Sequence, residues 1–186
     1  MSKISGRIDI IMGCMFSGKS TEIIRLINRY KALEKKILIV NHSSDTRYKE
    51  NSISTHSNIN ISCFSTADLA TLKTDEKYDY NGTDVIVIEE GQFFENLYDF
   101  AVRAADKDNK VVIVAGLDGD SNREEFGDII KLIPKCDSVV KLHALCSICK
   151  DGTLACFTKR IVKNQSKILV GVNEFIPVCR YHFNNT

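Results

Sequence analysis

The segment with the clearest chemistry is Gly13–Ser20, which fits the phosphate-loop pattern G-x-x-x-x-G-K-[ST]. An apolar run precedes it and a helical pattern begins near Thr21, which is the context that this pattern requires. Its glycines allow backbone N–H groups to face phosphate oxygens at the positive end of the following helix. Lys19 is then expected to reach the β- and γ-phosphates, and the Ser20 hydroxyl to bind Mg²⁺. The alternative is an ordinary glycine loop with a solvated lysine.

Two acids, Glu89 and Glu90, end a second apolar run at Val85–Ile88. In phosphate-loop enzymes an acid at this place holds the Mg²⁺ shell. Neighbouring side chains of an extended chain point to opposite sides, so one carboxylate can serve the metal while the other faces a substrate hydroxyl as a general base. The alternative is that both acids begin a solvated loop.

Three other segments are candidates for the wall of a ligand cleft. Phe93 and Phe94 would place aromatic surface beside the proposed base, although packing into the core explains each of them equally well. Asp45 and Arg47 follow a predicted strand and could approach the phosphates and the metal from a second side, or form a solvated turn. Residues 116–120 follow another predicted strand and either line the cleft or make a turn.

A metal site is indicated near the end of the sequence by two pairs of ligand residues, Cys146 with Cys149 and Cys179 with His182. Three thiolates and one imidazole complete a tetrahedral structural zinc site and leave no open position for catalysis. Strand-like runs at 154–157 and 168–170 between the pairs suggest a hairpin with a long loop. The alternative is four unrelated reduced side chains.

The other cysteines lack partners at ligand spacing. Cys63, Cys136 and Cys156 are expected to be buried thiols. Cys14 lies inside the anion-binding loop, where a thiolate could be stabilised, so we expect it to be unusually reactive.

The elements that must position these groups alternate between strands and helices. Continuous β-branched runs at 8–12, 37–40, 85–88 and 111–115, with a weaker one at 139–142, are typical of parallel strands covered on both faces. Apolar residues at helical spacing lie between them: Ile23, Ile27, Tyr30 and Leu33, then Leu97, Phe100 and Ala104. This order predicts an α/β fold, a doubly wound parallel sheet flanked by helices, with the phosphate loop at its carboxyl edge. The polar stretch 42–65 is expected to be a loop with a short strand at 59–64.

Size and composition limit the class of protein. The chain has 186 residues, which fits one α/β domain at 1–142 and a small zinc-binding domain at 143–186. The formal net charge of +1 argues against a nucleic-acid or membrane binder. No apolar run approaches 18 residues and no signal-peptide pattern opens the sequence, so we expect a soluble, cytoplasmic protein with reduced cysteines.

Taken together, these motifs resemble the tetrameric, zinc-containing thymidine kinases of cellular, poxviral and bacterial type. The resemblance covers about residues 7–183, and single motifs are widely shared while the ordered set is specific to this family. It is carried by the segments 13–22, 45–48, 90–94, 115–118 and 158–160 and by the two zinc pairs.

The resemblance implies ATP-dependent phosphorylation of the 5′-hydroxyl of thymidine, and of deoxyuridine, in pyrimidine deoxynucleotide salvage. It also implies a homotetramer that is inhibited by dTTP, structural zinc, and Mg²⁺ with ATP, bound by Ser20 and Glu89. Glu90 and Lys19 fall on catalytic positions. The positions implied to contact ATP are Gly13, Cys14, Met15, Phe16, Ser17, Gly18, Lys19, Ser20, Asp45, Thr46, Arg47, Glu89, Glu90, Gly91 and Gln92. The positions implied to contact the nucleoside are Met15, Phe93, Leu117, Ser121, Phe126, Thr158 and, from a lid loop at about 160–175, Ile168, Leu169, Val170, Gly171 and Phe175.

Four residues depart from the family pattern. Glu89 stands where Asp is usual and is one methylene longer, and Cys14 replaces a common Pro. Ser121 replaces an aromatic residue and Phe175 replaces a Tyr, which changes the expected wall of the nucleoside pocket. Two alternatives remain: a phosphate-loop enzyme with another small acceptor, and a zinc-ribbon protein that binds a partner or nucleic acid and uses nucleotide as a switch.

Overall fold

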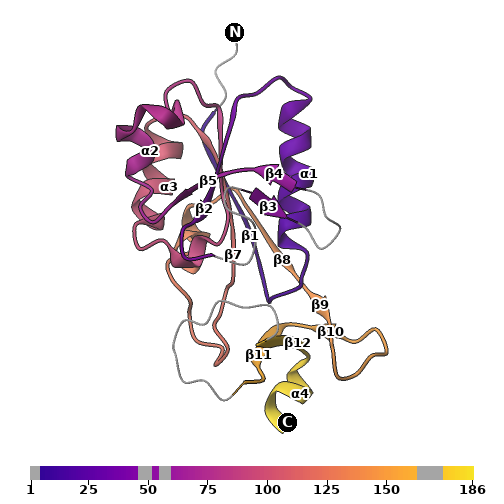
Figure 1. The fold of residues 1–186 in the computed structure, drawn as a ribbon. Coiled ribbons are helices and arrows are strands. Elements are labelled where there is room, and N and C mark those ends of the chain that lie inside the picture. Colours follow the sequence, from indigo (N-terminus) through magenta and orange to yellow (C-terminus); the bar gives the residue numbers. More distant parts are fainter. Residues whose placement is uncertain (1–4, 46–51, 55–59, 163–173) are drawn as a thin grey trace.

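The main body of the protein is a six-stranded parallel sheet flanked by helices (Figure 1). The computed structural model describes residues 5–45, 52–54, 60–162 and 174–186. The strands lie in the order β5-β2-β6-β7-β1-β8, and every neighbouring pair is parallel. Their bounds are Arg7–Gly13 (β1), Ile37–His42 (β2), Phe64–Thr66 (β5), Val85–Ile88 (β6), Val111–Gly116 (β7) and Ser138–Leu142 (β8).

All five strands predicted from apolar runs are therefore present, and the predicted α/β class is confirmed. The prediction of one short strand at 59–64 is wrong in its bounds. Its described part contains β4 (Asn60–Ser62), which pairs with β3 (Ser52–Ser54), and the start of β5, which joins the main sheet. The strand β5 lies at the edge of the sheet and is largely exposed, so it has no continuous apolar run to reveal it.

The helices cover both faces of the sheet, because each apolar strand has two faces to bury (Figure 1). On one face α1 (Lys19–Lys31) packs Ile23 and Ile27 against β1 and β2. On the other face lie α2 (Thr71–Thr74), α3 (Leu97–Asp106) and the short helices η1 (Glu76–Tyr78) and η3 (Ile130–Lys135). Leu33, expected on the buried side of α1, follows the end of that helix and is 66% exposed. None of the described helices is long and apolar enough to cross a membrane.

A smaller unit follows the sheet and is called the C-terminal unit below. It consists of β9 (Ala144–Leu145), β10 (Leu154–Ala155), β11 (Phe157–Arg160), β12 (Phe175–Val178) and α4 (Arg180–Asn185). The expected single strand at 154–157 divides at Cys156, because β10 pairs with β9 whereas β11 pairs with β12. The described partner of β11 is thus β12; the run at 168–170, which we expected to form the other half of a hairpin, lies outside the described residues.

Candidate active site and zinc site

The phosphate loop joins the carboxyl end of β1 to α1. Gly13 has a φ of +152° and Gly18 a φ of +86°, and a Cβ at Gly13 would come within 2.3 Å of the Leu142 carbonyl oxygen. These backbone angles and this close approach explain why glycine stands at both positions. Lys19 Nζ donates hydrogen bonds to the carbonyl oxygens of Gly13 and Cys14, at 3.1 and 2.9 Å. The loop backbone therefore holds the ammonium group of Lys19 at the entrance to α1.

The first turn of α1 meets the end of β6 at the pair Ser20 and Glu89. Ser20 Oγ donates a 2.5 Å hydrogen bond to Glu89 Oε1, and Glu89 is 6% exposed. A hydroxyl and a carboxylate oxygen are the hard ligands that Mg²⁺ takes in nucleotide sites. The donor set at this place therefore fits Mg²⁺, and the extra methylene of Glu89 does not keep its carboxylate from reaching Ser20.

Glu90 lies at the turn that ends β6 and is 7% exposed. Its φ of 52° and ψ of 42° are left-handed, so our expectation of an extended chain through both acids is wrong at Glu90. The short helix η2 (Gly91–Phe93) begins there, and a Cβ on Gly91 would lie 2.8 Å from the Val114 side chain. The two carboxylates still have different partners, since Glu90 Oε2 accepts a hydrogen bond from Gln92 Nε2.

The two phenylalanines after Glu90 have different surroundings. Phe94 is buried in the core beneath the sheet, so packing explains it. Phe93 is half-buried, and its ring meets that of Phe126 edge-on at 5.5 Å. Leu117 and Ser121, also expected at the nucleoside, are likewise partly exposed. These four partly exposed side chains are therefore still available to a ligand, whereas Phe94 is not.

The segment after β2 is described as far as Asp45. Asp45 Oδ2 accepts a hydrogen bond from Asn41 Nδ2 at 3.1 Å, which holds this carboxylate near the carboxyl end of β2. Thr46 and Arg47 lie outside the described residues, and so do Ile168, Leu169, Val170 and Gly171 of the expected lid. Phe175 is buried in β12, and the Arg160 guanidinium lies 5.5 Å from the centre of its ring.

The C-terminal unit contacts the phosphate loop directly, which the sequence patterns did not predict. The backbone N–H of Met15 donates a 2.9 Å hydrogen bond to Thr158 Oγ1 in β11, and the Cys14 thiol lies 3.4 Å from the Ala155 carbonyl oxygen. Cys14 also belongs to one apolar cluster with Ala155 and Val178. The phosphate loop is thus supported from one side by the C-terminal unit.

This packing overturns the expected reactivity of Cys14. The residue is 2% exposed, and burial raises the pKa of its thiol even though a backbone hydrogen bond and Lys19 oppose that change. An anion-binding loop lowers the pKa of a thiol only where the sulfur faces the loop's N–H groups, and here it faces an apolar cluster. Of the expected buried thiols, Cys63 is buried, and burial raises its pKa to about 11. Cys136 and Cys156 are only partly buried, so that prediction was wrong for them.

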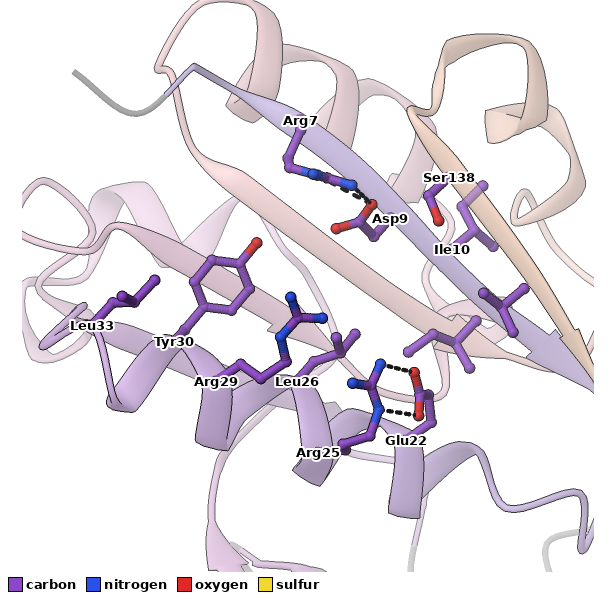
Figure 2. A pocket seen from close by; sticks show the side chains of 12 residues that line it. Arg7, Asp9, Ile10, Glu22, Arg25, Leu26, Arg29, Tyr30, Leu33 and Ser138 are labelled. Carbon is purple, nitrogen blue, oxygen red and sulfur yellow. Dashed lines mark hydrogen bonds and ion pairs between the residues drawn. The ribbon is translucent and has the colours of Figure 1, made fainter. Parts of the chain in front are cut away.

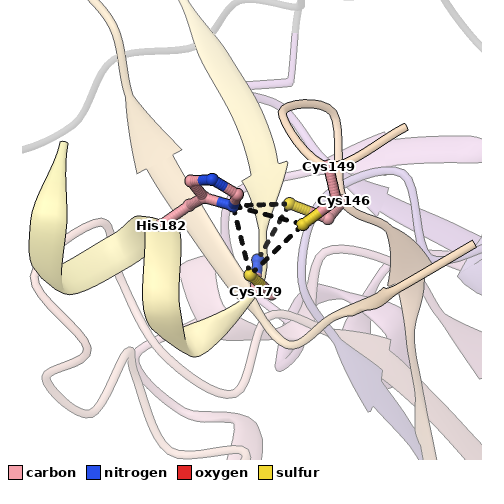
Figure 3. A group of neighbouring side chains, drawn as sticks. All are labelled: Cys146, Cys149, Cys179 and His182. Atoms are coloured by element: carbon pink, nitrogen blue, oxygen red, sulfur yellow. Dashed lines mark hydrogen bonds between the residues drawn. The ribbon is translucent and has the colours of Figure 1, made fainter. Parts of the chain in front are cut away.

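The four predicted zinc ligands come together between β9, β12 and α4 (Figure 3). Their ligand atoms all lie within 4.8 Å of one another. His182 Nδ1 is 3.2, 3.4 and 3.6 Å from the sulfurs of Cys149, Cys179 and Cys146, and the sulfurs of Cys149 and Cys179 are 3.8 Å apart. A tetrahedral zinc with bonds of about 2.3 Å separates its ligand atoms by about 3.8 Å. The side chains therefore fit a closed, structural Cys₃His zinc site.

The backbone around the cluster favours thiolate at Cys146. Burial disfavours that anion, but the N–H groups of Cys149, Cys179 and Ile148 outweigh burial and lower its pKa to about 6. Burial and the neighbouring Cys146 raise the pKa of Cys149 to about 11. A bound cation would favour the charged form of both thiols, as metal binding requires.

Two of the cavities that the described residues line have neither Glu89 nor Glu90 in their walls. One of about 340 Å³ lies between α1, β1 and β8, where the Arg25–Glu22 ion pair (2.6 Å) and Arg7 line it (Figure 2). A smaller one of about 150 Å³ lies where Cys14 and Thr158 meet an ion pair of 2.5 Å between Lys141 and Asp118. The first contains none of the predicted site residues, whereas the second adjoins the junction between the phosphate loop and the C-terminal unit.

The fold and the site define a class of protein first: a phosphate-loop enzyme in which a Ser–Glu pair fit for Mg²⁺ adjoins a second carboxylate. The comparisons narrow this class. A family model described as thymidine kinase matches residues 6–183. The chain is 43% identical to thymidine kinase a of Arabidopsis thaliana over 96% of this chain and 75% of the relative. It is 42% identical to the thymidine kinase of Myxoma virus (strain Uriarra) over 97% of both chains, and 39% identical to the cytosolic thymidine kinase of Cricetulus griseus over 96% of this chain and 74% of the relative.

The chain therefore belongs to the thymidine kinase family. It is an enzyme, and the family's reaction is the phosphorylation of thymidine. The resemblance noted from the sequence motifs is confirmed, and the alternative of a nucleotide-switched binding protein is set aside.

Proposed function

We propose that the protein transfers the γ-phosphoryl group of ATP, bound with Mg²⁺, to the 5′-hydroxyl of thymidine and of deoxyuridine for pyrimidine deoxynucleotide salvage. The observation that carries this proposal is the meeting of three groups at one edge of the sheet. Ser20 and Glu89 share a 2.5 Å hydrogen bond, and Glu90 follows directly in the chain. This arrangement supports a metal-binding pair and a base that would lie within reach of one phosphoryl group.

The donor side of the site is formed by the phosphate loop. Its backbone and Lys19 would neutralise the triphosphate, and Ser20 and Glu89 would hold Mg²⁺, which supplies positive charge at the β- and γ-phosphates. Asp45, Thr46, Arg47 and Gly91 are proposed to complete the ATP site from the ends of β2 and β6.

Glu90 is proposed as the general base. Its carboxylate would accept the proton of the 5′-hydroxyl as the phosphoryl group arrives, so that the reaction depends on position and charge and involves no covalent enzyme intermediate. The edge-on rings of Phe93 and Phe126 would bound the nucleoside beside it. The other proposed nucleoside contacts are Met15, Leu117, Ser121, Thr158, residues 168–171 and Phe175.

The zinc site is proposed to be structural. Its four ligands occupy the whole coordination shell, so the metal would hold β9, β12 and α4 together and take no part in the reaction. Residues 143–186 would then act as a separate zinc-binding domain that carries the lid. We also propose a cytoplasmic location, a homotetramer and inhibition by dTTP. Sedimentation equilibrium would test the homotetramer, and activity assays with added dTTP would test the inhibition.

The decisive experiment is ATP-dependent phosphate transfer to a panel of ribo- and deoxynucleosides, with Glu90→Gln as the test variant. We expect transfer to thymidine and deoxyuridine, and a fall in kcat of about 10²- to 10⁴-fold for Glu90→Gln. Glu95→Gln, which changes an exposed acid five residues further on, is the matched control. Failure to phosphorylate any pyrimidine deoxynucleoside would reject the function. Full kcat in Glu90→Gln would reject the base while leaving the activity.

A further inference from the structure

We propose that Gln92 is the positioning residue for the base, and that it links the orientation of the Glu90 carboxylate to the wall of the nucleoside pocket. This inference rests on the proposed role of Glu90. It also changes the expectation for Gln92, which the family resemblance placed among the contacts of ATP. The side-chain amide of Gln92 instead lies between Glu90 and Leu117.

The partners of Gln92 fix which way its amide points. The backbone N–H of Leu117 can only donate, and it does so to Gln92 Oε1 at 3.0 Å. The amide nitrogen therefore faces the other way and donates to Glu90 Oε2. Reversing the amide would bring two donors together at Leu117 and two acceptors together at Glu90, so a single orientation is stable.

Close packing holds Gln92 in this position. The residue is 4% exposed. A Cβ at Gly116 would lie 2.3 Å from Gln92 Oε1, and a Cβ at Gly127 would lie 2.2 Å from the Gln92 carbonyl oxygen. Both glycines thus leave room for Gln92. Gly116 directly precedes Leu117 and Gly127 directly follows Phe126, so Gln92 touches both segments that carry these proposed pocket residues.

The base needs such support because its backbone is unfavourable and its side chain is buried. A left-handed φ is sterically unfavourable for a non-glycine residue, and Glu90 adopts one of 52°. A general base must also lie within hydrogen-bond reach of the proton that it removes, and small displacements lower the rate steeply. Because Gln92 binds both Glu90 and the Leu117 backbone, it fixes the position of the base relative to the acceptor pocket.

Two substitutions separate positioning from simple packing. Gln92→Met keeps the approximate shape and removes both hydrogen bonds. We expect kcat for thymidine to fall about tenfold to 10²-fold, with affinity for a non-hydrolysable ATP analogue unchanged.

The activity of Gln92→Glu is expected to depend on pH in a distinctive way. This variant also keeps the proposal testable if Gln92→Met does not fold. Two adjacent carboxylates repel at neutral pH, whereas a protonated carboxyl at position 92 can again donate to Glu90. Activity relative to the unchanged protein should therefore rise as the pH falls. Equal losses at every pH, accompanied by a lower melting temperature, would overturn the proposal in favour of a purely structural role, and so would unchanged kcat and pH profile in both variants.

A double-mutant cycle with Glu90→Gln distinguishes this inference from the proposed function. If Gln92 acts through the base, then Gln92→Met should lower kcat much less in the Glu90→Gln background than alone. Additive losses would overturn the positioning role while leaving Glu90 as the base. Full activity of Glu90→Gln by itself would instead remove the assignment on which the inference rests.

Discussion

The hydroxyl of Thr158 accepts a 2.9 Å hydrogen bond from the backbone N–H of Met15, 143 residues earlier in the chain. The bond joins a strand of the C-terminal unit to the phosphate loop. Both residues are buried, so water cannot replace either partner. The shape of the phosphate loop therefore depends on the C-terminal unit, and several measurements should reveal that dependence.

Replacing Thr158 with Val keeps the shape of the side chain and leaves the Met15 N–H without an acceptor. We expect the free energy of unfolding to fall by about 1–3 kcal/mol, and a non-hydrolysable ATP analogue to bind more weakly. Thr158→Ser keeps the hydroxyl and serves as the control. Denaturant unfolding and calorimetric titration measure the two effects. Equal nucleotide affinity in the Val and Ser variants would contradict this role of the bond.

Removing the zinc should weaken nucleotide binding as well as folding. Chelation, or His182→Ala, would release β12 and α4, and Cys14 packs in the same cluster as Val178 of β12. We expect about one zinc per chain in the intact protein, and a lower melting temperature and lower affinity for the ATP analogue after its loss. His143→Ala changes an exposed histidine outside the cluster and should alter neither property. Unchanged melting after chelation would show that the four side chains hold no structural metal.

Cys14 should resist alkylation. Because burial raises the pKa of its thiol and excludes reagent, we expect iodoacetamide at pH 8 to modify it at least about tenfold more slowly than the same cysteine in unfolded protein. Peptide mass spectrometry after timed labelling gives the rate at each cysteine. The partly buried Cys136 provides the internal comparison within the same sample. A Cys14 that reacts faster than Cys136 would mean that its sulfur is accessible after all.

Asp108 should make the free energy of unfolding depend on pH in the acidic range. Partial burial opposes its ionisation, but hydrogen bonds from Lys73 Nζ (2.5 Å) and the Tyr80 hydroxyl (2.7 Å) outweigh burial and lower its pKa. A carboxyl with a lowered pKa in the folded state stabilises the fold above its unfolded pKa of about 3.9, and this contribution is lost as the pH falls through the folded value.

Asp108→Asn should therefore lower the free energy of unfolding at pH 7 by about 1 kcal/mol, a modest value because solvent screens the partly exposed group. The difference from the unchanged protein should shrink as the pH falls below 4 and disappear once Asp108 is protonated in both states. Urea unfolding across this range measures it. Asp106→Asn, at an exposed acid two residues earlier, is the control. A difference that stays constant down to pH 2 would assign the loss to packing.

The sheet could be predicted from the sequence because its strands are buried on both faces. Runs such as Val85–Ile88 are then continuous and β-branched, and a glycine-rich loop between one of them and a helix can lie only at the carboxyl edge. The grouping of the four candidate metal ligands could also be predicted, since His182 and the three cysteines are ligand residues at ligand spacing. The edge strand β5 was missed because its side chains face solvent.

The contacts that support the site were not predictable from local patterns. Nothing near Gln92 in the sequence indicates that its amide spans Glu90 and the Leu117 backbone, because that contact joins η2, which follows β6, to the segment that follows β7. The predicted reactivity of Cys14 was wrong for a related reason. Its neighbours in the sequence form an anion-binding loop, while its neighbours in space are the apolar side chains of the C-terminal unit.

The order of strands in the sheet also bears on how the chain can be made. The first strand, β1, lies between β7 and β8, and Ile10 is in register with Val114 on one side and Val139 on the other. A nascent chain emerging from the ribosome therefore cannot complete the support of its own phosphate loop until β8, at Ser138–Leu142, has been synthesised. Thr158, which holds Met15, emerges later still. Nucleotide can thus stabilise the native site only after Thr158 has been synthesised, and until β7 and β8 pair with β1 both edges of β1 expose unpaired backbone groups.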